Sequence, residues 1–169
     1  IGNTPWTVLA DGISVQIGRS IGQTTLLVSI AVLLLWIPLR EKPGIGTILN
    51  AVLIAAAIEY MLPMLPTPDS FALAFVQVVV GVILVGIGSG LYLTANLGPG
   101  PRDGWMTGIQ RRTGVPIGRV RAAIEVSVVI AGWLLGGTVG LGTVVFALMI
   151  GPVVAVCLNL AGWVGRTPG

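Results

Sequence analysis

Charged residues are scarce in this sequence, and histidine is absent. Only 9% of the 169 residues are charged, whereas 54% are hydrophobic and the mean hydropathy is +0.98. Such a chain has too little polar material to cover a water-soluble domain, so we expect the lipid bilayer to be its solvent. Without histidine, the most common general base and the most common metal ligand are both missing. We therefore expect no metal, no cofactor and no enzymatic activity.

Cysteine is almost as rare. The single cysteine, Cys157, lies in an apolar run, which excludes an internal disulfide and argues against a catalytic thiol. The net charge of +3 comes from basic residues between hydrophobic runs, and no water-soluble region is present to offer them to nucleic acid. We expect these residues to set the topology in the membrane, with lipids and not nucleic acid as their partners.

Long hydrophobic runs are what the sequence does contain. A membrane-spanning helix needs about 20 mostly apolar residues, and its backbone groups pair within the helix. Apolar runs of about this length, without polar alternation, predict an all-α, polytopic transmembrane helical bundle. The five runs are 24–39, 47–62, 71–96, 117–136 and 143–160.

The sequence also contains an internal repeat. When residues 1–63 are aligned with residues 97–159 without a gap, 15 of the 63 pairs are identical, and six of these pairs are glycines. Gly44-Ile45-Gly46-Thr47, for example, falls on Gly140-Leu141-Gly142-Thr143. Residues 1–63 and 71–160 are therefore interpreted as two diverged copies of one unit within a single membrane domain.

The two copies differ at their starts. The hydrophobic run 71–96 precedes the glycine-rich segment of the second copy, but no such run precedes the equivalent segment of the first. We therefore expect three helices in each repeat, with the first helix of repeat 1 absent from this chain. An odd number of crossings makes the second copy start on the other side of the membrane. The sequence thus predicts two inverted-topology repeats, together with short re-entrant or interfacial segments.

The basic residues predict an orientation. If successive loops alternate between the two sides of the membrane, Arg19 lies alone on one side and eight basic residues lie on the other. These eight are Arg40, Lys42, Arg102, Arg111, Arg112, Arg119, Arg121 and Arg166. Positively charged loops face the cytoplasm, so we expect a multi-pass protein of the bacterial cytoplasmic (inner or plasma) membrane with its C-terminus in the cytoplasm.

Three glycine-rich motifs lie in the second half of the chain. They are Gly98-Pro99-Gly100-Pro101-Arg102-Asp103-Gly104, Gly132-Trp133-Leu134-Leu135-Gly136-Gly137 and Gly140-Leu141-Gly142-Thr143. Together they resemble the YczE/YyaS/YitT family of bacterial integral membrane proteins, over most of the chain. The resemblance implies a cytoplasmic-membrane protein of a kind often suspected of transport. Family members tend to have Pro-Trp-Asp in the first copy, where this chain has Pro5-Trp6-Thr7, so only the second copy keeps its acid, Asp103.

The segment 98–104 must interrupt a helix, because its two prolines lack amide donors and resist helical geometry. We expect a short helix over residues 104–113 to follow. Free amides at its start, with Arg102 beside them, would favour an anionic group. Alternatively, the segment is a tight cytoplasmic turn in which Asp103 caps the helix and Arg102 faces lipid phosphates.

The two Gly-x-Gly-Thr motifs precede helices and place Thr47 and Thr143 as their N-caps. If these motifs dip into the membrane, Gly46 and Thr47 form one half of a central site, and Gly142 and Thr143 form the other. Broken helices at matching positions of inverted repeats mark such sites in transporters. Short connections between helices also favour glycine, so both interpretations stay open.

Glu125 is the clearest single candidate, because an unpaired charge inside an apolar helix is costly. Arg121, one turn earlier, can pair with it. Alternatively, Glu125 faces a polar cavity and binds a cation or a proton. Further polar groups in apolar runs predict hydrogen bonds between helices or a cavity lining, and glycines in the run 71–96 predict close helix packing. The polar groups are Glu59, Gln77, Asn50 and Asn159, and the glycines are Gly81, Gly86, Gly88 and Gly90.

These features predict a small-molecule transporter or exporter of unknown substrate, with a central site between the inverted repeats. Its candidate substrate-binding residues are Glu125, Asp103, Arg102, Thr47, Thr143, Gly46, Gly142 and Gln77. The alternative is a non-transporting accessory or scaffold subunit of a larger membrane complex, which the short loops and small size would suit. The expected partners are membrane lipids, a small-molecule substrate, and a second copy or another membrane protein.

Overall fold

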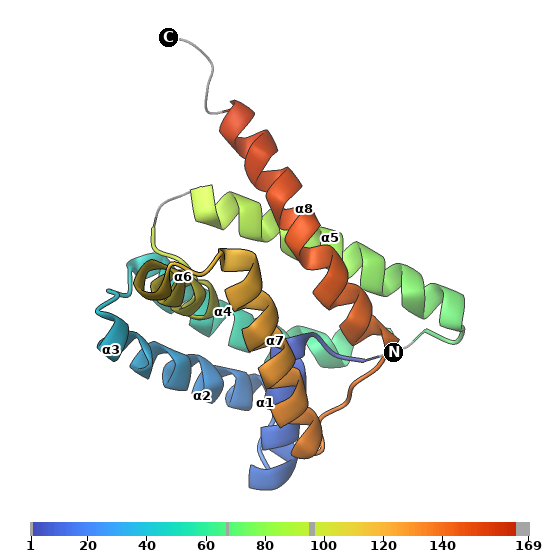
Figure 1. The fold of residues 1–169 in the computed structure, drawn as a ribbon. Helices are drawn as coiled ribbons and strands as arrows, with labels where there is room; N and C mark the ends of the chain where they lie inside the picture. The colour runs from blue at the N-terminus through green and yellow to red at the C-terminus, as the bar shows by residue number, and fades with distance from the viewer. Residues whose placement is uncertain (1, 67, 95–96, 165–169) are drawn as a thin grey trace.

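Helices make up the chain in the computed structural model, which describes residues 2–66, 68–94 and 97–164 (Figure 1). No strand occurs among these residues, so the all-α prediction is confirmed. Arg166 and the side chain of Asn159 lie outside the described part of the chain. The elements are α1 (Pro5–Ile17), α2 (Ile21–Leu34), α3 (Trp36–Leu39), α4 (Ile45–Met61), the 3-10 turn η1 (Leu62–Met64), α5 (Phe71–Thr94), α6 (Pro101–Thr113), α7 (Ile117–Leu134) and α8 (Leu141–Val164).

In the described part of the chain, each of the five predicted hydrophobic runs lies mostly in helices, and three stretches are long and apolar enough to cross a membrane. These stretches are Ile21–Leu39, Ile45–Met64 and Phe71–Tyr92. Leu141–Val154 in α8 is a shorter apolar helix. Helix α7 is less apolar because it carries Arg119, Arg121 and Glu125. The composition and the helices together support an integral membrane protein.

The sequence did not predict α1. The Thr4 hydroxyl caps its start by accepting the amide of Thr7 at 3.4 Å, and Pro5 occupies the first helical position, where its missing amide costs nothing. Helix α6 likewise begins at a proline, Pro101, three residues before the predicted start. Both helices end at a glycine in the left-handed conformation, Gly18 and Gly114.

The helix starts recur with the spacing of the sequence repeat. Helices α1 and α6 begin at residues 5 and 101, α2 and α7 at residues 21 and 117, and α4 and α8 at residues 45 and 141. Each pair is separated by 96 residues. Gly2 and Gly98, also 96 apart, share a left-handed φ of 109° and 107°.

Two glycines that lie 96 residues apart make corresponding contacts with two threonines that are also 96 residues apart. A Cβ atom at Gly2 would come within 2.8 Å of the Thr143 hydroxyl, and one at Gly98 would come within 2.8 Å of the Thr47 hydroxyl. The segment before α1 therefore packs on the start of α8, and the segment before α6 packs on the start of α4. These corresponding contacts recur with the 96-residue spacing of the sequence repeat.

Thr47 and Thr143 are not N-caps, which corrects the sequence prediction. Gly44 is the N-cap of α4, and its amide donates to the Thr47 hydroxyl at 3.1 Å. The Gly140 amide donates to the Thr143 hydroxyl in the same way, at 3.2 Å. Glycine reaches the extended cap conformation easily, so the threonine sits three residues later and satisfies the amide of the cap residue.

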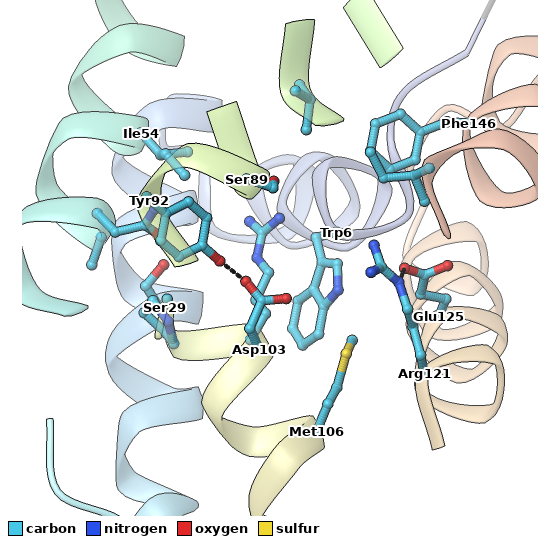
Figure 2. Close-up of a pocket in the computed structure, with 17 residues that line it drawn as sticks. Trp6, Ser29, Ile54, Ser89, Tyr92, Asp103, Met106, Arg121, Glu125 and Phe146 are labelled. Atoms are coloured by element: carbon cyan, nitrogen blue, oxygen red, sulfur yellow. Dashed lines mark hydrogen bonds and ion pairs between the residues drawn. The ribbon is translucent and has the colours of Figure 1, made fainter. Parts of the chain in front are cut away.

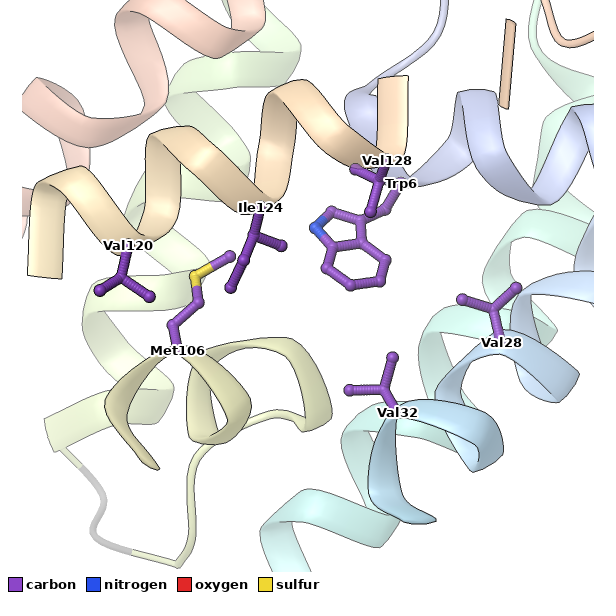
Figure 3. Packing of buried hydrophobic residues seen from close by; sticks show 7 residues of the cluster. All are labelled: Trp6, Val28, Val32, Met106, Val120, Ile124 and Val128. Atoms are coloured by element: carbon purple, nitrogen blue, oxygen red, sulfur yellow. The ribbon is translucent and has the colours of Figure 1, made fainter. Parts of the chain in front are cut away.

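Helix pairs form the core. Helix α5 packs along α8, α1 along α7 and α2 along α4. Side chains of α1, α2, α6 and α7 meet in the main apolar cluster, shown in Figure 3. Its buried members are Trp6, Val28, Val32, Met106, Val120, Ile124 and Val128. A smaller cluster of Val82, Ile150 and Val154 joins α5 to α8.

Two of the four glycines predicted to allow close packing do so. A Cβ at Gly86 would overlap Val153 of α8, and a Cβ at Gly90 would come within 2.8 Å of the Cys157 Cβ. Gly81 and Gly88 face open space instead, which corrects that part of the prediction. Residues four apart lie on the same helix face, so Gly86 and Gly90 form one packing surface.

Candidate functional site

A cavity of about 130 Å³ is lined by residues of seven helices, α1, α2 and α4 to α8, and charged groups gather around it (Figure 2). Its charged lining consists of Arg102 and Asp103 from α6 and Arg121 and Glu125 from α7. Ser29, Asn50, Ser89 and Tyr92 add neutral polar groups. Charges inside an apolar helical protein are costly and mark functional sites, so this cavity is the candidate site.

Arg102 lies against an aromatic face. Its guanidinium carbon is 4.9 Å from the centre of the Trp6 ring, and Trp6 packs edge-on against Trp105 at 6.3 Å. Among the described residues, Arg102 has no ion pair and no hydrogen-bond acceptor. Burial lowers its pKa to about 10, against the opposing effect of Glu125, so the guanidinium stays positive at neutral pH. The Arg102 guanidinium is therefore a positive charge without an ionic partner in the described part of the chain.

Asp103 points toward α5, where its carboxylate accepts a hydrogen bond from the Tyr92 hydroxyl (Figure 2). It lies in the first turn of α6 but does not cap the helix, because Gly100 is the N-cap. Burial raises the pKa of the Asp103 carboxyl; Arg121 opposes this shift and Glu125 adds to it. The site thus holds a carboxyl that takes up a proton more readily than an exposed aspartate does.

Glu125 forms the predicted ion pair. Its Oε1 accepts from Nε of Arg121 at 2.9 Å, and the residue is only 7% exposed. The pair also lines the cavity, so the two interpretations of Glu125 are not exclusive. Four residues separate the partners, which places them one turn apart on one face of α7.

The Gly-x-Gly-Thr motifs lie beside the site and do not line the cavity between Arg102 and Glu125. The Gly46 amide donates to the Leu97 carbonyl at 2.9 Å, and the Thr47 hydroxyl donates to the Pro99 carbonyl at 2.7 Å. These bonds hold the segment that leads into Arg102. Gly142 and Thr143, at the matching place in α8, line two neighbouring cavities.

Gln77 lies away from the other candidate residues. Its side-chain amide donates to the Pro66 carbonyl at 3.2 Å, near the start of α5. Twelve residues separate it from Ser89, or roughly 18 Å along the helix axis. Glu59 is also outside the cavity and accepts a hydrogen bond from the Ser20 hydroxyl. The structure therefore brings Arg102, Asp103 and Glu125 together and leaves Gln77 apart.

The basic residues divide into two groups. Arg111 at the end of α6 pairs with Glu41 at 2.8 Å, so the loop after α3 lies beside the end of α6. Arg102 and Arg121 do not lie in loops as predicted; their side chains line the cavity. In the described part of the chain, no three His, Cys, Asp or Glu side chains come together as metal ligands.

Sequence reasoning did not identify Trp6 and Tyr92 as parts of the site. Position 6 aligns with position 102 in the repeat, so Trp6 contacts the residue at its own equivalent position. The alignment of position 6 with position 102 was therefore the sequence signal from which Trp6 could have been predicted as part of the site. No sequence pattern distinguishes Tyr92, because its hydrogen bond to Asp103 depends on how α5 and α6 are placed relative to each other.

Two relatives match most of the chain. One is an "Uncharacterized protein" of Haemophilus influenzae, 44% identical over 168 residues, which cover 99% of this chain and 77% of the relative. The other is the "Uncharacterized membrane protein YczE" of Bacillus subtilis, 33% identical over 153 residues, which cover 89% of this chain and 71% of the relative. No solved structure matches the chain.

A family described as "Family of unknown function (DUF6198)" matches residues 1–159. This match and the similarity to YczE agree with the family that the glycine-rich motifs of the second half predict. The chain therefore belongs to the DUF6198 family, which places it with YczE among the bacterial membrane proteins.

Proposed function

We propose that this protein transports a small molecule across the bacterial cytoplasmic membrane through the cavity lined by Arg102, Asp103, Arg121 and Glu125. The observation that carries the proposal is the gathering of four charged groups inside a chain with few charges. Such groups mark the paths of substrates and ions in membrane proteins. One of them, Arg102, has no ionic partner among the described residues, which leaves it available to bind a substrate.

The proposed transporter has two inverted repeats. Support comes from the exchanged contacts of Gly2 with Thr143 and of Gly98 with Thr47, because a twofold relation between two copies produces such exchanges. Trp6 and Arg102, at equivalent positions, contact each other, as residues near a twofold axis do. Three membrane crossings in each copy, with α1 and α6 as short interfacial helices, would then give the copies opposite orientations in the membrane. A binding site beside the axis is typical of transporters built in this way.

The proposed orientation places the Arg40–Lys42 loop, the end of α6 and the C-terminus in the cytoplasm. The ion pair between Glu41 and Arg111 supports a common side for this loop and for α6. We further propose that the protein binds and releases its substrate without chemical conversion, since no nucleophile with a neighbouring base is evident in the sequence.

Flux through the purified protein tests the proposal. Proteoliposomes with and without the protein are incubated in a defined mixture of bacterial metabolites, and their contents are measured by mass spectrometry. We expect at least one solute to accumulate only with the protein. Replacing Arg102 by Gln should reduce that flux by about tenfold or more, because a charged hydrogen bond to the substrate is lost.

Glu59→Gln is the matched control, because Glu59 is a hydrogen-bonded carboxylate of the same fold outside the cavity. It should leave flux unchanged, whereas Glu125→Gln should abolish it while the protein stays folded. Equal flux in Arg102→Gln and the wild type would contradict the proposed site. Absence of flux for every solute, with a second membrane protein copurifying in fixed ratio, would favour the accessory-subunit alternative.

A further inference from the structure

A second and larger cavity lies between α7 and α8, with a volume of about 470 Å³. Its walls are almost entirely aliphatic, and several of them are exposed on the outside of the fold. The main lining residues are Val126, Val129, Ile130, Val144, Ala147 and Leu148. In a bilayer, an opening of this kind faces lipid chains and not water. We refer to this cavity as the α7–α8 groove.

The α7–α8 groove breaks the correspondence between the two copies. In the first copy, α2 packs along α4, and Gly22 lies against Ala55 and Glu59. The equivalent helices, α7 and α8, make no comparable extended contact among the described residues. Gly151 of α8 lines the groove, and a Cβ there would meet nothing within 4 Å. The space is therefore a specific feature of the second copy.

The groove and the charged cavity share part of their lining. Arg121 and Glu125 border both spaces, so the ion pair stands between the apolar groove and Arg102. A single ligand that reaches past this pair would have its apolar part between α7 and α8 and its polar end among the charged residues.

The charges indicate the sign of that polar end. Arg121 is already neutralised by Glu125, and Asp103 accepts the Tyr92 hydroxyl. Arg102 remains without an anionic partner among the described residues. A buried cation is stabilised by an anion at hydrogen-bonding distance, so an acidic group fits the site better than a basic or neutral one.

We propose that the ligand of this site is an anionic amphiphile, with one alkyl chain in the α7–α8 groove and an acidic head group at Arg102, which enters sideways from the lipid. This inference rests on the proposed function and names the substrate class of the same site. A small water-soluble anion would leave the groove unused, and a neutral lipid would leave Arg102 without its counter-charge.

Photolabelling of the full chain in proteoliposomes tests the inference without requiring flux. The probes are a diazirine derivative of palmitic acid and the matching derivative of hexadecanol, and labelled peptides are located by mass spectrometry. We expect the acid to label α7 and α8 preferentially and the alcohol to label all lipid-facing helices alike. Excess unlabelled palmitic acid should suppress the preferential labelling, whereas inorganic phosphate should not.

Two leucine variants separate the groove from the rest of the surface. Gly151→Leu adds a side chain that projects into the groove from a position where a Cβ meets nothing within 4 Å. It should reduce labelling of α7 and α8 by about tenfold, since several methylene groups of the probe lose their place. Gly88→Leu adds the same side chain at an open position of α5 and should change nothing. Equal labelling of Gly151→Leu and wild type would overturn the proposal.

Two variants of Arg102 test the head group. Arg102→Gln should reduce the preference for the acid over the alcohol by about tenfold, and Arg102→Lys should retain most of it. If inorganic phosphate suppressed the preferential labelling, the site would bind a free anion, and the proposal of an amphiphilic ligand would be overturned. Preferential labelling without any flux would contradict the transport function but not the amphiphile as ligand. Flux of a water-soluble solute without preferential labelling would overturn the amphiphile as ligand but not transport.

Discussion

Arg102 and Trp6 contact each other at the centre of the protein, although 96 positions separate them in sequence. A guanidinium over an indole at a half-buried position contributes about 0.5–2 kcal/mol. The sequence identified Arg102 as a binding candidate because of the glycine-rich segment around it. It did not identify Trp6, because the stretch before residue 20 carries no long apolar run and was not assigned to a helix.

Removing the Trp6 ring should destabilise the fold. Trp6 is 5% exposed and packs against both Arg102 and Trp105, so Trp6→Ala should lower the free energy of unfolding by about 3–5 kcal/mol. Thermal unfolding in detergent measures the effect. Trp133 is 64% exposed on α7, and Trp133→Ala is expected to stay within about 0.5 kcal/mol of wild type. Equal losses in the two variants would contradict the described packing.

Asp103 should make stability depend on pH. The folded protein raises the pKa of this carboxyl, so it binds a proton more tightly than the unfolded chain does. Stability is therefore favoured below the ordinary aspartate pKa of about 3.9 and decreases as the pH rises through the folded pKa. Asp103→Asn should flatten the dependence of the unfolding temperature on pH above about 4, the ordinary aspartate pKa. The exposed Asp69→Asn serves as control, and an unchanged profile in Asp103→Asn would contradict the prediction.

The ion pair of Glu125 was predictable, whereas the rest of its surroundings was not. Arg121 and Glu125 are four residues apart in one helix, so helix geometry alone places their side chains one turn apart on the same face. The cavity that both residues border depends on how α1, α5 and α6 pack. That packing is set by contacts between residues far apart in the chain, such as Tyr92 with Asp103 and Trp36 with the Pro101 carbonyl.

Helices followed from the hydrophobic runs, since apolar stretches of this length have few other ways to pair their backbone groups in lipid. The ends were less certain: α4 begins at Ile45 and not Thr47 because Gly44 serves as the cap. Helix α1 was missed because its residues are mixed in polarity. Its equivalence to α6 in the repeat could have predicted it, as both begin at a proline and end before a glycine.

The contact between α5 and α8 should depend on the face formed by Gly86 and Gly90. A side chain at position 86 would overlap Val153, so Gly86→Leu should separate the helices and lower the unfolding temperature in detergent. We expect a loss of about 1–3 kcal/mol, as for other overpacked positions. Gly88→Leu, on the open side of the same helix, is the matched control. A similar loss in both variants would show that helix packing is not the cause.

For the molecule as a whole, the charged loops and the sequence repeat together predict the topology in the membrane. Basic residues at the end of α6 lie beside the loop after α3, while Arg19 lies in the turn between α1 and α2. The positive-inside rule then assigns the first group to the cytoplasm. Sequence reasoning counted Arg102 and Arg121 among these loop charges, but they belong to the cavity. Without a view of the packing, a basic residue near a helix end cannot be told apart from one that turns inward.

Cysteine accessibility measures this topology. In a Cys157→Ser background, single cysteines are introduced as Arg19→Cys, Lys42→Cys and Arg112→Cys. A membrane-impermeant maleimide applied to intact cells should label position 19, and it should label positions 42 and 112 only after permeabilisation. Labelling of all three positions from the same side would contradict the proposed inverted arrangement of the two repeats.

The meeting of Trp6 and Arg102 also bears on how such a chain could arise. Two identical units related by a twofold would bring the same residue face to face at this point, so an arginine would meet an arginine and the charges would repel. Once the two halves differ in sequence, one half can carry an indole while the other keeps its guanidinium. Joining the halves in one polypeptide therefore permits an attractive, unequal pair that a symmetric homodimer could not make.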